Sequence, residues 1–235
     1  MEILYRDRWL LIAEKPIGML SEKTDGGEDI LSVLERETGG YVGSVHRLDR
    51  TTGGAMVFSA DKSVTGKLSE AIRAREFTKE YLAVLEGVPA EPEGVLTDLL
   101  FHDRRTNKVF VVSGERKGAK QASLAYRVLD VAGTEKGEST LVRVTLHTGR
   151  THQIRVQFAS RGLPLAGDGK YGGRDNRSHT AALWSYHLCF AHPVTGKPVE
   201  AFSFPPEEAY PWSLWQGRLR EVCGGEKSAS GETVT

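Results

Sequence analysis

The sequence contains very little cysteine, since only Cys189 and Cys223 occur among its 235 residues. A disulfide framework is therefore not expected, and a reduced, cytoplasmic location fits this composition. There is no CxxC or HExxH spacing and no Gly-x-x-x-x-Gly-Lys-Ser/Thr phosphate loop. The sequence thus predicts chemistry that requires neither a metal nor a cofactor.

The chain also lacks a long hydrophobic run. No apolar segment approaches the roughly 18 residues that a membrane-spanning helix requires. The opening MEILYRDR has early acidic residues, instead of the basic and then apolar layout of a signal peptide. We therefore expect no membrane partner.

Net charge is absent as well, because 31 Lys and Arg residues balance 31 Asp and Glu residues. The distribution is uneven: residues 102–127 and residues 143–177 each hold seven basic and two acidic residues, whereas residues 1–40 hold five and nine. Phosphate contacts depend on the local field, so two basic segments are compatible with an RNA partner. The alternative is that these charges belong to ordinary solvated surfaces and that their uneven distribution has no ligand behind it.

Hydrophobic periodicity and turn residues divide the chain into short strands and few helices. Helical spacing covers residues 29–37, with Asp29 placed to cap the helix, and residues 62–76. Strands are expected within residues 2–14, 56–60, 81–86, 97–112, 119–131, 140–145, 153–158, 181–190 and 199–204. This order predicts an antiparallel-dominated α+β fold over residues 1–223, and the polar segment 224–235 is expected to be a disordered tail.

The most informative string is HRLDRTTGG at residues 46–54. It places Asp49 between Arg47 and Arg50, and its glycines lead into the apolar run AMVFSA, which is typical of a buried strand. The two arginines favour the ionised form of Asp49 and are also able to bind phosphates. Taken alone, the string is also compatible with a structural turn.

A second string, TLHTGRTHQIRVQF, covers residues 145–158. Its Thr-Gly pair predicts a tight turn, and the alternation that follows predicts a strand with Arg155 on the face opposite Ile154. Arg150, His152 and Arg155 supply planar donors for a phosphate, a base or a carboxylate. The alternative for Arg155 is a surface arginine of a strand.

A third string, GLPLAGDGKYGG at residues 162–173, is a glycine-rich loop in which Asp168 is expected to form a turn. With these three strings in this order, the sequence resembles the RluA-type pseudouridine synthases, which isomerise uridine to pseudouridine in ribosomal or transfer RNA. The resemblance also includes ILYRDRWLLIAEKPIGMLS, FTKEYLAVLEG and LCFAHPVTGKPVEAFSFPPE, so it extends from residue 3 to residue 208.

The resemblance implies a mixed, mainly antiparallel sheet bent around a central catalytic cleft, with helices on the outer faces. It also implies a cofactor-independent enzyme that acts on a stem-loop of structured rRNA or tRNA, and we expect a monomer. Many relatives carry a small RNA-binding module before the catalytic part. Because the opening strand begins at residue 3, a catalytic domain alone is expected here.

The resemblance also assigns the catalytic residues. Asp49 matches the family's essential nucleophile, and Arg155 matches the cation that pairs with it. Tyr81 matches the tyrosine that stacks on the flipped uracil, and its hydroxyl is a candidate for removing the ring proton. Leu183 matches the apolar side of the pocket, although a strand leucine or tyrosine is ordinarily a core residue. Whether Asp49 attacks the pyrimidine ring or the sugar stays open.

Six further residues of these strings are expected to bind RNA or to shape its site: His46, Arg47, Arg50, Arg150, His152 and Gln153. Among them, Arg47 is expected to enter the stem that the uridine leaves or to bind a phosphate, and His46 to orient the loop through a hydrogen bond. Three of the four tryptophans, Trp184, Trp212 and Trp215, are expected to pack against the sheet rather than to stack on bases.

The sequence departs from the family pattern at two places. The usual Thr-Ser-Gly after the first string is Thr-Gly-Gly at residues 52–54, and the usual Leu-His-Ala is Leu-Trp-Ser at residues 183–185. Neither change removes a catalytic group, and both leave the identity of the RNA and of the uridine open.

Two other classes of function compete with this interpretation. A non-catalytic RNA-binding protein would keep the fold, but binding alone does not require Asp49, Tyr81 and Arg155 as a set. A metal-dependent hydrolase that uses the seven histidines is a weak alternative, because no two histidines have a recognisable ligand spacing with a carboxylate nearby.

Overall fold

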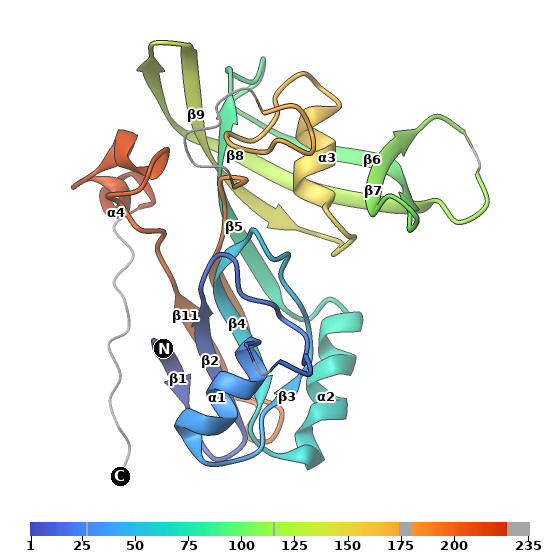
Figure 1. Ribbon diagram of the computed structural model, residues 1–235, viewed down its shortest axis with the longest axis vertical. Coiled ribbons are helices and arrows are strands. Elements are labelled where there is room, and N and C mark those ends of the chain that lie inside the picture. The colour runs from blue at the N-terminus through green and yellow to red at the C-terminus, as the bar shows by residue number, and fades with distance from the viewer. Residues whose placement is uncertain (27, 115, 174–179, 225–235) are drawn as a thin grey trace. The chain divides into compact units, whose positions relative to one another are not determined.

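A computed structural model of the protein describes residues 1–26, 28–114, 116–173 and 180–224, which form two compact units (Figure 1). Unit 1 comprises Met1–Lys79 and Trp184–Pro205. Unit 2 comprises Glu80–Leu183 and the segment from Pro206 to the end of the described residues. Apart from Gly224, the tail expected at residues 224–235 lies outside the part of the chain that the structure describes.

Unit 1 is built on a mixed sheet. Its strands are β1 (Ile3–Arg6), β2 (Leu10–Lys15), β3 (Gly43–Ser44), β4 (Gly53–Ser59), β10 (Leu183–Ala191) and β11 (Pro198–Phe202). The first residue of β10, Leu183, is assigned to unit 2. The pairs β1–β2, β2–β4, β3–β4 and β10–β11 are antiparallel, whereas β10 runs parallel to β4. This parallel pairing begins at Gly53, which is why β4 starts three residues before the predicted strand.

Two helices accompany this sheet, as the sequence predicted. In α1 (Ile30–Thr38), the Asp29 carboxylate accepts a hydrogen bond from the Ser32 N–H at 2.9 Å and so caps the helix. The second helix, α2 (Lys62–Arg73), packs against β4. The core of unit 1 combines residues of α2 with residues of β2, β4, β10 and β11: Leu10, Ile12, Ala55, Val57, Val64, Leu68, Leu188, Phe190, Val199 and Ala201.

Unit 2 contains an antiparallel sheet in the order β5 (Thr78–Glu86), β9 (Gly137–Leu146), β8 (Lys120–Thr134), β6 (Glu93–Asp103) and β7 (Lys108–Val112). The segment predicted as strand at residues 97–112 is thus a hairpin of two strands, and Asn107 adopts φ +47° in its turn. The predicted class, an α+β fold with a mixed and mainly antiparallel sheet, is confirmed.

The strand predicted at residues 153–158 is wrong, because the segment forms the helix α3 (Gln153–Ala159). All residues from Gln153 to Phe158 are buried, so the polar positions of the alternating pattern do not face solvent. The side chains of Arg155 and Gln157 instead bond to polar partners inside the protein. A buried helix is therefore able to carry alternating polar and apolar residues. Successive helical side chains are about 100° apart, so the predicted placement of Arg155 opposite Ile154 is also wrong.

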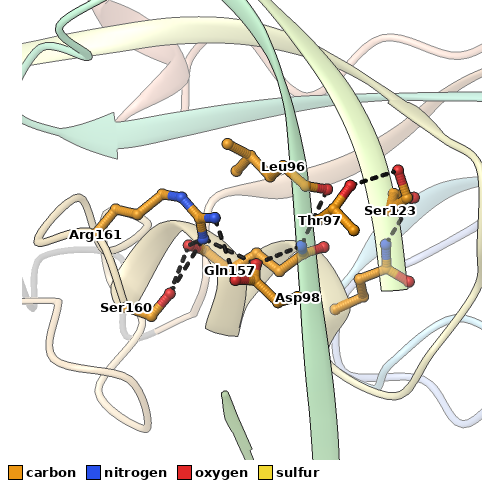
Figure 2. A network of polar contacts seen from close by, with 8 residues as sticks. Leu96, Thr97, Asp98, Ser123, Gln157, Ser160 and Arg161 are labelled. Carbon is orange, nitrogen blue, oxygen red and sulfur yellow. Dashed lines mark hydrogen bonds and ion pairs between the residues drawn. The ribbon is translucent and has the colours of Figure 1, made fainter. Parts of the chain in front are cut away.

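A polar network holds α3 against β6 (Figures 1 and 2). The Gln157 Nε2 donates hydrogen bonds to the Leu96 carbonyl at 3.3 Å and to the Asp98 carboxylate at 2.7 Å. The Arg161 guanidinium donates to both oxygens of Asp98, at 2.9 and 3.2 Å (Figure 2). Asp98 therefore fastens the C-terminal end of α3 to β6.

Two short helices, η1 (Trp212–Trp215) and α4 (Leu219–Val222), follow in unit 2. Trp212 and Trp215 are buried, and the indole Nε1 of Trp215 donates to the Asp130 carboxylate at 3.0 Å. Trp184 is likewise buried in unit 1. The prediction that these tryptophans pack is confirmed.

Candidate functional site

Residues 46–52, which we call the Asp49 loop, lead into β4 in unit 1. Asp49 is half-buried in a turn that the Thr52 N–H closes by donating to the Asp49 carbonyl at 3.0 Å. The loop is tied to the KPIG turn of residues 15–18, because the Gly18 N–H donates to the Arg50 carbonyl at 2.8 Å and the Arg50 Nε donates to the Gly18 carbonyl at 2.9 Å. These two bonds fix the backbone directly after Asp49.

His46 anchors the other side of the Asp49 loop. Its Nε2 accepts a hydrogen bond from the Val57 N–H of β4 at 3.0 Å. Burial lowers the pKa of His46 to about 3, and the charge of Lys79 acts in the same direction. The imidazole is therefore neutral near pH 7, as an accepting Nε2 requires. This contact corresponds to the loop-orienting role that we expected of His46.

Lys15 is a candidate site residue to which sequence reasoning assigned no role. Its side chain is fully buried, and Nζ donates to the carbonyls of Pro16 at 2.8 Å and Met19 at 2.9 Å. Burial lowers the pKa of Lys15 to about 8, while the negative charge of Asp49 acts in the opposite direction. A buried amine thus lies within electrostatic range of Asp49. The KPIG string was the signal that could have found it.

Arg47 and Arg50, which flank Asp49, have exposed side chains. The Arg47 Nη1 lies 3.2 Å from the Glu22 carboxylate, and both side chains of this pair are more than half exposed. Exposed pairs of this kind contribute little to stability, because water and salt screen them. An anionic ligand is therefore able to compete with Glu22 for the Arg47 guanidinium.

In unit 2, Arg155 lies in the first turn of α3 and is 5% exposed. Its Nε and Nη2 donate to the two carboxylate oxygens of Asp168, at 2.7 and 2.8 Å. Asp168 is 1% exposed and also accepts from the Lys170 N–H at 3.2 Å. Asp168 therefore has the predicted place in a turn, and it also joins the second and third strings through a buried bidentate ion pair that the sequence did not reveal.

Tyr171 connects the same loop to the beginning of α3. Its hydroxyl accepts from the Val109 N–H at 2.9 Å and lies 2.8 Å from the His152 Nδ1. The Arg155 guanidinium lies 5.1 Å from the centre of the Tyr171 ring, within the range of a cation–π interaction. His152 adopts φ +50° at the N-terminus of the helix. Tyr171 thus contacts His152 and Arg155 at the same time.

Gln153 shapes the turn before α3. Its Oε1 accepts from the Thr148 hydroxyl at 2.7 Å and from the Arg150 N–H at 3.0 Å, and its Nε2 donates to the Ser123 carbonyl at 3.0 Å. The side chain of Arg150 is exposed, and its Nε donates to the Gln121 carbonyl at 3.1 Å. Gln153 is therefore bonded within the protein, whereas the Arg150 guanidinium reaches the surface.

Tyr81 and Leu183 are buried strand residues. Tyr81 lies in β5, opposite Val144 of β9, and Leu183 is the first residue of β10. The residues that the sequence predicted as catalytic or pocket-forming are thus divided, with Asp49 in unit 1 and with Tyr81, Arg155 and Leu183 in unit 2.

The residues that the structure describes contain neither a metal-binding cluster nor a membrane-spanning helix. Within them, no group of three or more His, Cys, Asp and Glu side chains is arranged to hold a metal ion. None of the helices formed by these residues has the length and apolar character to cross a membrane.

The chain is similar to known proteins over most of its length. The sequence model of the family described as RNA pseudouridylate synthase matches residues 9–160. The dual-specificity RNA pseudouridine synthase RluA of Yersinia pestis is 32% identical over 206 residues, which cover 85% of this chain and 96% of that protein. The ribosomal large subunit pseudouridine synthase D of Zymomonas mobilis is 30% identical over 229 residues, covering 88% and 70%. The structure named human RNA pseudouridylate synthase domain containing 1 has a similar fold, with a TM-score of 0.77 and 24% identity over 91% of this chain and 87% of that chain.

Proposed function

Because this chain belongs to the RNA pseudouridylate synthase family and is an RluA-type RNA pseudouridine synthase, we propose that it isomerises one specific uridine in structured rRNA or tRNA, with Asp49 as the nucleophile. The observation that carries this proposal is the construction of the Asp49 loop. His46 holds one side of the loop through Val57, and Arg50 holds the other through Gly18. A carboxylate on a loop anchored on both sides is pre-organised for attack.

The reaction exchanges one bond of the uridine for another. The bond between the sugar carbon and the ring nitrogen breaks, the uracil rotates while it is held, and the sugar carbon bonds to a ring carbon. That ring carbon loses its proton, and the ring nitrogen gains one. Asp49 has to be ionised to attack at either the ring or the sugar. The buried Lys15, whose pKa the charge of Asp49 affects, contributes a positive charge near this carboxylate.

Arg155 is proposed as the second cation of the reaction, acting on Asp49. An arginine that positions a carboxylate must itself have a fixed orientation, since its planar donors act only along defined directions. Asp168 and the ring of Tyr171 supply that orientation from two sides.

Tyr81 is proposed to stack on the flipped uracil, and Leu183 to line the apolar side of the same pocket. The tyrosine hydroxyl is the group of that side chain able to accept or donate a proton, which suits it to remove the proton from the ring carbon. Both residues lie in strands, and strands hold functional side chains more rigidly than loops do.

RNA recognition is proposed to combine the basic segments with exposed arginines. Arg47, Arg50 and Arg150 have exposed side chains suited to phosphates. The uridine has to leave its stack, which costs a few kcal/mol, and Arg47 is proposed to occupy the stem or to bind a phosphate there. His152 and Gln153 support Arg150 by fixing the turn before α3. We expect the enzyme to act as a cytoplasmic monomer, without a cofactor.

Replacing the nucleophile tests this proposal. We expect Asp49→Asn to abolish isomerisation and to leave the RNA dissociation constant within a few-fold of the wild type, because the amide keeps the size of the side chain but is no nucleophile. The assay is release of tritium from bulk RNA labelled at the ring carbon of uridine that forms the new bond, prepared from cells that lack this protein.

The exposed Asp25→Asn serves as the matched control and should release tritium like the wild type. Measurable turnover by Asp49→Asn would rule out Asp49 as the nucleophile. Binding of the RNA by the wild type without any release of tritium would instead favour the non-catalytic RNA-binding protein.

A further inference from the structure

Gly53 and Trp184 lie opposite each other where β4 and β10 run parallel. Gly53 opens β4 immediately after the Asp49 loop, and the turn that holds Asp49 ends at Thr52. A displacement of Gly53 would therefore also displace its neighbour Thr52, the residue whose N–H closes the turn around Asp49.

The indole of Trp184 occupies the space that a side chain at position 53 would need. A Cβ atom on Gly53 would lie 2.3 Å from Cζ3 of Trp184, 2.8 Å from Cε3 and 2.9 Å from Cη2. All three atoms belong to the six-membered ring of the indole. Only glycine at position 53 therefore allows the indole and β4 to keep their present positions.

The indole is held in place by buried hydrogen bonds. Trp184 is 3% exposed, and its Nε1 donates to the Ser203 hydroxyl at 2.9 Å. The Ser203 hydroxyl in turn donates to the Glu14 carboxylate at 2.7 Å. Moving the indole would leave a buried donor without its partner, which is costly. A side chain at position 53 would therefore displace the start of β4 rather than the indole.

Gly54, the next residue, is a glycine for a different reason. It adopts φ +108°, and a Cβ there would lie 2.3 Å from the carbonyl oxygen of Ser185. This obstacle is backbone, which no substitution at position 184 removes. The obstacle at position 53 is a side chain, so a smaller residue at position 184 would relieve it.

We propose that Gly53 and Trp184 form a matched positioning pair that sets the place of the Asp49 loop. Gly53 and Trp184, two of the three positions at which this sequence departs from the family pattern, are thus neighbours in the sheet, and the loss of a side chain at one accommodates the larger ring at the other. The pair touches no reacting atom and acts through the backbone of the loop. The inference rests on the proposed role of Asp49.

A double-mutant cycle tests the pair. Gly53→Ser should lower the single-turnover rate of tritium release from the RNA described above by about tenfold to hundredfold, because a shift near 1 Å at a catalytic group has effects of this size. The RNA dissociation constant should stay near that of the wild type. Trp184→His removes the six-membered ring, so Gly53→Ser in the Trp184→His background should cause less than about a threefold further loss.

Gly54→Ser is the matched control, since adding Trp184→His should not restore its rate. The amide shifts of residues 48–52 in 1H–15N spectra give a second readout: Gly53→Ser should move them, and Trp184→His should bring them back. If Gly53→Ser alone does not fold, folding of the double variant is itself the expected rescue.

The proposal is overturned if Gly53→Ser lowers only the melting temperature, with unchanged rate and unchanged loop shifts. It is overturned equally if Trp184→His restores neither the rate nor the shifts, or if the double variant does not fold. Absence of tritium release from the wild type would contradict the proposed function, and the loop shifts would still decide the positioning pair.

Discussion

Arg155 and Asp168 are both almost completely buried, so each offsets the cost of removing the other's charge from water. Their bidentate geometry, with distances of 2.7 and 2.8 Å, also fixes the plane of the guanidinium. The pair therefore links stability to the orientation of a proposed catalytic arginine. A carboxamide in place of the Asp168 carboxylate should affect both.

We expect Asp168→Asn to lower the free energy of unfolding by about 3–5 kcal/mol, the cost of leaving one charge of a buried pair without its partner. The single-turnover rate of the folded variant should fall as well. Urea denaturation and the tritium assay measure the two effects. Asp98→Asn provides the control, because its partner Arg161 is 34% exposed and should be less affected by losing the charge. Equal losses of stability in the two variants would contradict this account.

The neutral His46 makes the stability of the protein depend on pH. Its pKa in the folded protein is about 3, below the ordinary value of about 6.5 in an unfolded chain. Between these values the unfolded state binds the proton and the folded state does not. The contribution of the neutral His46 to the free energy of unfolding is therefore complete above pH 6.5 and is lost as the pH falls toward 3.

We expect the free energy of unfolding to decrease between pH 7 and pH 5, and to decrease less steeply in His46→Gln, which does not titrate there. Glutamine keeps an acceptor for the Val57 N–H. Urea titrations at pH 7, 6 and 5 measure both slopes. The same slope in both proteins would show that His46 is not the titrating group.

At the scale of elements, α3 depends on its surroundings. It has only seven residues, Gln153–Ala159, and isolated helices of this length are unstable in water. Gln153 shapes the turn that precedes it, and Gln157 joins it to β6 at the other end. Arg155 lies between these contacts, which hold the helix, and its guanidinium is oriented by Asp168.

We expect Gln157→Met, which keeps the length of the side chain, to cost about 1–3 kcal/mol of stability, because the Leu96 carbonyl and Asp98 lose a buried donor. The rate of the folded variant should change little, since Asp168 still orients Arg155. Ser160→Ala, which removes an exposed hydroxyl at the end of the helix, should have a smaller effect on stability. A large loss of rate in Gln157→Met would show that the network also positions Arg155.

At the scale of the whole molecule, basic residues gather in two segments of a chain without net charge. In unit 2 the turn between β7 and β8 exposes Arg116 and Lys117, and the first residue of β8 exposes Lys120. The Arg116 guanidinium lies 3.6 Å from the centre of the Phe101 ring. Exposed cations beside an aromatic ring suit both the phosphates and the bases of RNA.

We expect RNA affinity to fall clearly between about 50 and 200 mM salt, with each neutralised phosphate contributing about 0.7–0.9 to the log–log slope. Lys117→Ala and Lys120→Ala should each reduce the slope by about that amount. Lys23→Ala, in the acidic N-terminal segment, should leave it unchanged. Fluorescence anisotropy at several salt concentrations provides the measurement. A constant affinity would contradict an RNA surface built on these segments.

Much of the fold could be predicted from the sequence, because its signals are local. Asp29 caps α1 and the apolar spacing of residues 62–76 produces α2, and neither needs a distant partner. The three strings in their order are sufficient to indicate the family. They also place Asp49 in a turn before a buried strand, where the structure has it.

Tertiary structure alone decided what depends on distant partners. Arg155 is able to lie in a buried helix because Asp168, thirteen residues away, accepts its hydrogen bonds and balances its charge. The alternating pattern of residues 153–158 does not indicate that partner. Lys15 lies within electrostatic range of Asp49, which is far from it in the sequence. Gly53 and Trp184 are far apart in the chain, and only the parallel pairing of β4 with β10 makes the glycine and the indole a single unit of packing. Local sequence determines the elements that carry their own caps and apolar spacing. The form of the buried segment 153–159 and the space available to a side chain depend instead on the neighbours that the fold brings to them.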